Sequence, residues 1–325
     1  MKVPQFLSIV WSEPEGPLIE PPRFSPLIAD PSFLFPAESP RGNWELFAHS
    51  AWGVHRFSSS DGLAWWDWGV VVRNAMRPFV RRIDDGQGDS PDFTLLYEAY
   101  PPLALPLSAL PWKRPWKSRI AASWSDNLDT WTGREPLVEP DLPWKQDLAL
   151  GASVSNPCLI EAGGEWLLYH SASLAWIEDC GFCEPRYIAL SRGKSPNGPF
   201  VPDPSPVIDP ARDSLPGVLG AGSIKVLVLE DGFIGLQNKI YRDGQGKSRS
   251  AIFLLRSEDG LRWEDARREP LIAPATGWTS SHVYACDCRE DAATGIWYLY
   301  FNARDGWRTT EGRERIGRIV GHPAG

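Results

Sequence analysis

Polar residues whose side chains can do acid-base or metal chemistry stand at matched places along this chain. Four of them open short apolar, β-prone stretches, Asp30, Arg77, Asn156 and His282, and a fifth such stretch opens at Ala221 or Gly222. Five more close the stretch that follows each opening: His49, Glu98, His170, Gln237 and Asn302. Carboxyl groups can act as general acid and base, and histidine can hold a metal or a hydrogen bond. Whether they act together depends on the elements that position them.

A repeated hairpin motif indicates what those elements are. It combines an apolar strand, an Asp-Gly turn and a tryptophan, and it is clearest at residues 257–263, SEDGLRW. Related text occurs at 60–65, at 125–131 and, in weaker form, at 191–200. In a tight turn, Asp-Gly supplies a glycine that can adopt positive φ. Repeated hairpins without helical periodicity are typical of a β-propeller.

The repeat predicts one all-β domain, a five-bladed β-propeller with four strands in each blade. We expect the blades at residues 23–73, 74–140, 141–210, 211–275 and 276–325. Residues 15–21, EGPLIEP, match the last strand of the fourth blade, EPLIAP at 269–274, and the fifth blade lacks such a strand. The N-terminal strand, within residues 1–22, is therefore expected to join the fifth blade and close the ring. The Pro-rich segment 101–117 is expected to form a loop over one face or against a partner.

In a propeller, the innermost strands run side by side along a central channel. Residues at the same end of these strands converge on one patch, and the ends of the second strands return to the same face. The polar openings and closings would therefore form one ring of side chains. Because buried polar groups without partners are costly, the ring indicates a ligand site more than a core.

Composition limits the partners and the location. The 325 residues carry a net charge of -8, which disfavours nucleic acid or an anionic membrane as a partner. No apolar run approaches the ~20 residues of a membrane helix, and the N-terminus lacks a signal-peptide core, so we expect a cytoplasmic protein. Oligomeric state is not indicated. Cysteines 180, 183, 286 and 288 could form a zinc site, but small buried apolar residues are the favoured interpretation.

Several short motifs resemble glycoside hydrolase family 43 and its relatives, the five-bladed arabinanases, xylosidases and fructosidases. They are ADPSF at 29–33, SNPCLI at 155–160, the S-x-DG-x-x-W hairpins and the histidine that opens blade five. The resemblance covers essentially the whole chain. It implies that Asp30 is the general base and that His282 borders a central water or calcium ion. It fails at two carboxylates, because Asn156 stands where one tunes the acid, and residues 220–223, GAGS, lack the acid itself.

Hydrolysis with inversion still requires an acid and a base, about 6.5–9.5 Å apart. Asp30 is the predicted base, with a plain Asp-Pro turn as the alternative. Glu98 is the predicted acid, because it ends the apolar run FTLLY and apolar surroundings raise a carboxyl pKa. An ion pair with Arg77 is the alternative for Glu98. The predicted sugar-binding residues are His49, Arg77, Asn156, His170, Gln237 and Asn302.

Two functions remain open from the sequence. The first is a glycosidase that cleaves a small arabinoside, xyloside or fructoside by single-displacement inversion. It requires no cofactor, although a calcium or other divalent cation could bind on the axis at His282. The second is a propeller that binds a sugar or another small ligand without cleaving it.

Overall fold

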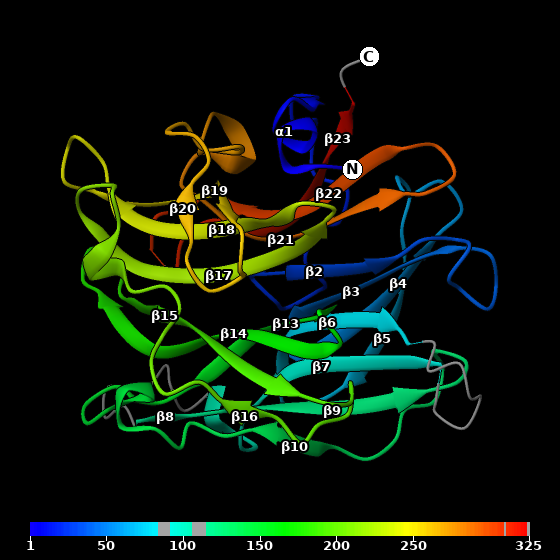
Figure 1. Cartoon of the computed structure of the whole chain (residues 1–325), viewed down its shortest axis with the longest axis horizontal. Coiled ribbons are helices and arrows are strands. Elements are labelled where there is room, and N and C mark those ends of the chain that lie inside the picture. The colour runs from blue at the N-terminus through cyan, green and yellow to red at the C-terminus, as the bar shows by residue number, and fades with distance from the viewer. Residues whose placement is uncertain (84–91, 106–114, 309, 324–325) are drawn as a thin grey trace.

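The computed structural model describes residues 1–83, 92–105, 115–308 and 310–323, and this part of the chain is almost entirely β-structure (Figure 1). Its named helices are α1 (Val3–Leu7) and three single 3-10 turns, at Pro143–Lys145, Pro210–Arg212 and Gly277–Thr279. Among the described helices, none has the length and apolar character needed to cross a membrane. The all-β prediction is confirmed.

The described residues form five four-stranded antiparallel sheets. The first holds β2 (Ala29–Leu34), β3 (Trp44–Ser50), β4 (Gly53–Ser59) and β5 (Trp66–Val72). The second holds β6 (Ala75–Arg82), β7 (Phe93–Ala99), β9 (Arg119–Ser125) and β10 (Glu135–Val138). The third holds β13 (Val154–Ala162), β14 (Glu165–Ile177), β15 (Phe182–Gly193) and β16 (Val201–Pro202).

The fourth sheet holds β17 (Val218–Leu229), β18 (Gly232–Arg242), β19 (Ser248–Ser257) and β20 (Glu264–Asp265). The fifth holds β21 (His282–Asp291), β22 (Ile296–Arg304), β23 (Glu314–His322) and, at its edge, the N-terminal β1 (Val10–Trp11). A separate small sheet is formed by β8 (Trp116–Lys117), β11 (Gln146–Asp147) and β12 (Gly151–Ala152). The predicted grouping of four strands therefore recurs throughout.

The repeated motif forms the turn that its residues predict. After β19, the Asp259 carboxylate accepts the backbone N–H groups of Leu261 and Arg262, each at 2.8 Å, while the Ser257 hydroxyl accepts that of Gly260 at 2.9 Å. Gly260 has φ +71°, which a residue with a Cβ adopts only at a cost. Its carbonyl accepts the hydroxyl of Tyr169 at 2.7 Å. The turn thus also ties the fourth sheet to the third.

Each innermost strand carries a β-bulge near its start. The residue at the bulge has positive φ in four sheets: Asp30 (53°), Arg77 (55°), Asn156 (48°) and Gly222 (57°). In the fifth sheet the irregularity lies between Val283 and Cys286, so Tyr284 rather than His282 corresponds to these four. A bulge re-aims a side chain, and its exact place is set by hydrogen-bond register that the motif does not reveal.

The innermost strands contact one another in sequence. β2 contacts β6, β6 contacts β13, β13 contacts β17, β17 contacts β21, and β21 contacts β2. Apolar clusters fill the spaces between sheets, one of them combining Leu96, Leu168 and Ile224 from the second, third and fourth sheets. Another packs Phe6 of α1 against Trp297 of β22, at 4.9 Å between ring centroids.

The N-terminal segment pairs with the fifth sheet. Val10 lies opposite His322 and Trp11 opposite Gly321, and Ile19 forms an isolated bridge with Ile316. Figure 1 shows α1 beside the red β23. The predicted pairing around residues 16–19 is therefore present as a single bridge, while the regular strand lies earlier, at β1.

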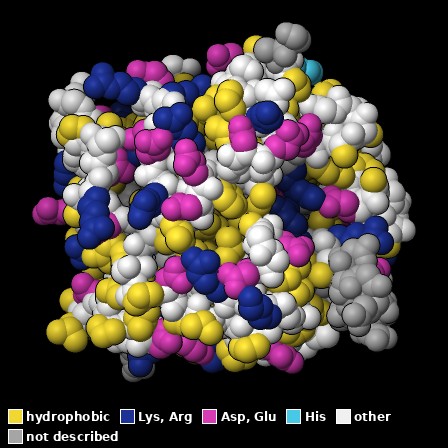
Figure 2. Space-filling view, in the orientation of Figure 1, with side chains coloured by type: hydrophobic (Ala, Val, Ile, Leu, Met, Phe, Trp, Pro, Cys, Tyr) yellow, Lys and Arg dark blue, Asp and Glu magenta, His cyan; other side chains and the backbone are white. Residues whose placement is uncertain are grey.

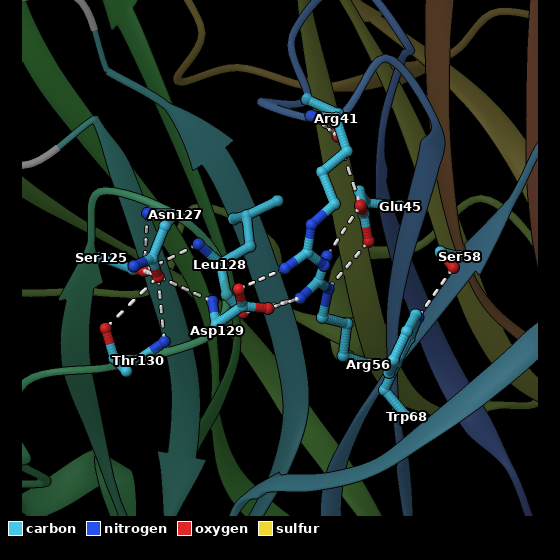
Figure 3. Close-up of polar contacts among 11 residues, drawn as sticks. Arg41, Glu45, Arg56, Ser58, Trp68, Ser125, Asn127, Leu128, Asp129 and Thr130 are labelled. Atoms are coloured by element: carbon cyan, nitrogen blue, oxygen red, sulfur yellow. Dashed lines mark hydrogen bonds and ion pairs between the residues drawn. The ribbon is translucent and has the colours of Figure 1, made fainter.

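Arg56 connects the first and second sheets (Figure 3). Its side chain is 2% exposed and donates from Nε and Nη2 to the two oxygens of Glu45, each at 2.8 Å. Its Nη1 donates to the carboxylate of Asp129 at 2.5 Å and to the carbonyl of Leu128 at 3.2 Å. A buried guanidinium is stable only when its donors are satisfied in this way. Figure 2 shows acidic and basic side chains interspersed over one face of the molecule, without a single basic field.

Candidate active site

A cavity of about 270 Å³ lies where the innermost strands begin. Side chains or backbone from all five sheets line it, and this volume is close to the lower end of known small-ligand pockets, about 300–1,000 Å³. Its polar lining residues are Asp30, His49, Ser50, Arg77, Asn156, Glu184, Ser223, Asn238, Tyr284, Asn302, Arg304 and Glu314. Five predicted site residues are among them: Asp30, His49, Arg77, Asn156 and Asn302.

Asp30 has a polar neighbour on each of two sides, Asn302 and His49. Its backbone N–H donates to the amide oxygen of Asn302 at 3.1 Å, and its Oδ2 lies 3.2 Å from Nδ1 of His49. Burial raises the pKa of Asp30, while the positive charges of Arg77 and Lys225 oppose that rise. Burial, aided by Arg77, lowers the pKa of His49 to about 3, so this imidazole is neutral. Its Nδ1 accepts the backbone N–H of Arg77 at 3.2 Å.

Glu98 forms an ion pair with Arg77, which was the alternative to its predicted role as the acid. Its side chain is 0% exposed, and its Oε2 lies 2.5 Å from Nη1 of Arg77. Its Oε1 accepts the indole N–H of Trp116 at 3.0 Å. Glu98 does not line the cavity, whereas Arg77 does. The predicted acid is therefore held by Arg77 and Trp116 outside the cavity lining, and its role as an acid stays a prediction.

Three further predicted residues are buried away from the cavity. His170 lies with Nε2 3.3 Å from the hydroxyl of Ser191, and Gln237 donates to the carbonyl of Ala221 at 3.0 Å. Neighbouring residues of a strand point to opposite faces, so Asn238, which follows Gln237, lines the cavity instead. The amide position was predicted one residue too early.

His282 is the third of these residues. Its Nδ1 lies 2.6 Å from the Ser281 hydroxyl and its Nε2 lies 3.5 Å from the Cys180 sulfur. Burial lowers its pKa to about 3, with Arg304 and Arg249 adding to the effect. Among the described residues, no group of three or more His, Cys, Asp or Glu could hold a metal ion. That finding speaks against the four-cysteine zinc site, and a cation at His282 stays a prediction.

Two carboxyl groups at the cavity were missed by the sequence reasoning. Glu184 lies in β15, and burial raises its pKa to about 8, an effect that Arg77 opposes and Glu314 increases. Glu314 begins β23, and burial raises its pKa to about 7, opposed by Arg304 and increased by Asp30. Glu184 lies near the start of the third strand of its sheet, and Glu314 begins the third strand of its own sheet. In an antiparallel sheet this is the same end as the start of the first strand, so third-strand openings were the available signal.

The two carboxyl groups differ in their hydrogen bonds. Glu314 accepts a bond from the amide nitrogen of Asn302, whose oxygen in turn accepts the backbone N–H of Asp30. Asn302 thus links Glu314 to Asp30. Glu184 is 8% exposed and, within the described part of the chain, forms no hydrogen bond or ion pair of its own. Its carboxyl group is therefore open toward the cavity.

Glycines explain why the opening of β17 carries no carboxylate. A Cβ on Gly222 would lie 2.1 Å from the carbonyl oxygen of Asn238, and one on Gly220 would lie 2.6 Å from that of Pro185. Pro185 directly follows Glu184, so β15 approaches β17 at this point. Glu184 accordingly reaches the cavity next to the opening that lacks an acid.

Comparison with known proteins supports the fold. No protein-family model and no curated protein sequence matches this chain. A family 62 α-L-arabinofuranosidase of Coprinopsis cinerea is similar in structure, with 15% identity, 97% of both chains covered and a TM-score of 0.65. A family 117 glycoside hydrolase of Zobellia galactanivorans has 16% identity, 97% and 90% coverage and a TM-score of 0.57.

A thermostable family-43 glycoside hydrolase has 13% identity, 92% coverage of this chain and 89% of its own, and a TM-score of 0.59. At these identities the likeness is one of fold. The predicted resemblance to the propeller glycoside hydrolases around family 43 is confirmed at that level.

Proposed function

We propose that this chain is a five-bladed β-propeller, closed by its N-terminal strand, that hydrolyses a glycosidic bond in a small sugar or oligosaccharide. The cyclic contacts of β2, β6, β13, β17 and β21 support the ring, as does the pairing of β1 with β23. The observation that carries the activity is the meeting of three carboxyl groups, Asp30, Glu184 and Glu314, from three sheets in one cavity.

Asp30 takes the role of general base. Burial raises the pKa of Asp30, the charges of Arg77 and Lys225 oppose that rise and so favour the ionised form, and Asn302 accepts its backbone N–H. Its place at the opening of β2 matches the base position implied by the family 43 motif. As an ionised carboxylate, Asp30 would accept a proton from the attacking water.

Glu184 takes the role of general acid in place of Glu98. With its pKa raised to about 8 by burial, it holds a proton near neutral pH, and no protein group in the described residues competes for that proton. A negative charge on Glu314 raises the pKa of Glu184 further, so Glu314 would keep the acid protonated.

In the proposed reaction, water attacks the anomeric carbon while Asp30 takes its proton. The bond from that carbon to the leaving oxygen breaks, and Glu184 donates its proton to the oxygen. The anomeric configuration inverts, as expected when two carboxyl groups stand about 6.5–9.5 Å apart with room for water between them.

The test is hydrolysis of aryl and natural arabinosides, xylosides and fructosides. Asp30→Asn should lower turnover by about 10²–10⁴-fold on every substrate. Glu184→Gln should spare nitrophenyl glycosides, whose leaving groups need little protonation, and impair natural linkages. The exposed residues Asp126 and Glu135 provide matched Asp→Asn and Glu→Gln controls. Full activity of Asp30→Asn would refute this mechanism.

Sugar binding without hydrolysis is the second candidate. It is favoured by Asn156 and Gly222, which stand where the family motif implies carboxylates. In that case the parent protein would cleave none of these substrates while binding a sugar in calorimetry, and Asp30→Asn would alter affinity alone.

A further inference from the structure

Arg304 is a second cation that lines the cavity, and in the described part of the chain its hydrogen-bond partners are backbone carbonyls. Its side chain is 6% exposed. Its Nε donates to the carbonyl of Gly306 at 3.0 Å, and its Nη2 donates to those of Arg308 and Glu311, each at 2.6 Å. Three of its five N–H groups thus hold the connection between β22 and β23. Within the described residues, the two N–H groups of Nη1 have no hydrogen-bond partner.

The charge of Arg304 acts on Glu314 and Glu184, but within the described residues Arg304 forms no ion pair with a carboxylate. The buried guanidinium of Arg56 is paired with Glu45, and Arg77 is paired with Glu98. Arg304 forms no ion pair with any described residue, although it lines the same cavity as Arg77. A buried charge is costly unless it is paired, so a buried arginine that lines a cavity and has two donors without a partner is a site for an anion.

The other charges around the cavity agree with this. Asp30 and Glu98 are balanced by Arg77 and Arg304, and the positive charge of Lys225 also acts on Asp30. Burial keeps Glu184 and Glu314 at least partly protonated near neutral pH, because their pKa values are raised to about 8 and about 7. Below about pH 7, where both are mostly neutral, the set has one positive charge in excess. A ligand with one negative charge would neutralise this excess.

We propose that the sugar bound in this cavity is acidic, and that its anionic group accepts hydrogen bonds from Nη1 of Arg304. The shared chemistry is an anionic oxygen, which a uronic acid offers as a carboxylate and a sulfated sugar offers as a sulfate. This inference deepens the proposed function by naming the substrate class. It rests on the cavity binding a sugar, and it does not require that the sugar be cleaved.

The test is calorimetry of the full-length protein with matched sugars: glucose, galactose, glucuronate, galacturonate and the two 6-sulfates. A hydrogen-bonded charge contact predicts affinity about 10- to 100-fold higher for an acidic sugar than for its neutral counterpart. Preference for the uronates or for the sulfates identifies the source of the anion. Equal binding of neutral and acidic sugars by the parent protein, or no binding of any acidic sugar, would overturn the proposal.

Variants locate the contact. Arg304→Gln should lower the affinity for the acidic sugar to that of its neutral counterpart, while Arg304→Lys should retain part of the difference between the acidic and the neutral sugar. Arg313→Gln, an exposed arginine on the same connection, is the matched control and should change neither. A preference that survives in folded Arg304→Lys and Arg304→Gln alike would also refute the assignment.

Binding and hydrolysis can fail separately. Cleavage of neutral glycosides with no acidic preference would refute the anion site and leave the hydrolase standing. Tight binding of a uronate without hydrolysis of any glycoside would support the anion site and refute the hydrolase.

Discussion

Replacing Glu98 by glutamine separates the two roles that its position allows. Glu98 is fully buried and paired with Arg77, so the neutral amide would leave the guanidinium without its counter-charge. Removing one partner of a buried ion pair typically costs about 3–5 kcal/mol. Arg77 is 19% exposed at the cavity, where water can partly solvate it, so we expect a loss near the lower limit, about 3 kcal/mol.

That loss is large beside a typical domain stability of about 5–15 kcal/mol, and urea denaturation will measure it as a lower transition midpoint. A double variant, Arg77→Met with Glu98→Leu, removes both charges together. It should be less destabilised than Glu98→Gln alone, because no unpaired charge remains.

Kinetics complete the comparison. If Glu98 acts as the structural partner of Arg77, Glu98→Gln should lower activity on nitrophenyl and natural substrates alike, because it disturbs Arg77. If the variant is as stable as the parent and loses activity only on poor leaving groups, Glu98 is the acid and our interpretation of the ion pair is wrong.

Three further outcomes follow from the site and the ring. Because the pKa of Glu184 is raised from 4.5 to about 8, kcat/KM of the parent should fall as pH rises through about 8. Because of the same shift, the contribution of Glu184 to the stability of the folded protein is greatest below pH 4.5 and is lost as pH rises through about 8. Glu184→Gln should therefore melt at a higher temperature than the parent at pH 9 but not at pH 5. An unchanged difference in Tm at the two pH values would contradict the buried acid. Gly222→Glu should not provide an acid but should unfold the site, since its Cβ would lie 2.1 Å from the Asn238 carbonyl; a folded, more active variant would show that this close approach is wrong. Deleting residues 1–22 removes β1 and Phe6 and should cause aggregation or a broad transition in circular dichroism, whereas an intact melting curve would argue against closure by the N-terminus.

The strands and turns could be predicted from sequence because their chemistry is local. Serine, aspartate and glycine at fixed spacing specify the turn at residues 257–260, and apolar residues flank it. The position of each bulge could not be predicted, because it depends on cross-strand register. For that reason His282 was aligned with Asp30, although Tyr284 occupies the corresponding place.

The two carboxyl groups Glu184 and Glu314 were missed at the cavity for a related reason. Sequence reasoning sought carboxylates at the first-strand openings and at the second-strand ends, and so selected Glu98. Glu184 and Glu314 lie at or near the start of third strands, which the sequence reasoning did not consider. Only the packing of β15 against β17, permitted by Gly220, shows that Glu184 borders the cavity.

The left-handed backbone at the strand openings also determines how this site can diverge. Asp30, Asn156 and Gly222 belong to the three residue types that tolerate positive φ best, whereas other residues pay roughly 1–2 kcal/mol there. Exchange among aspartate, asparagine and glycine can therefore add or remove a carboxylate with little effect on folding. Asn156→Asp remains an open path for engineering, but Gly222 does not, since the Asn238 carbonyl now occupies the space that a side chain would need. The backbone thus tolerates a residue without a carboxylate at the openings of both β13 and β17, but it has room for a new carboxylate only at Asn156.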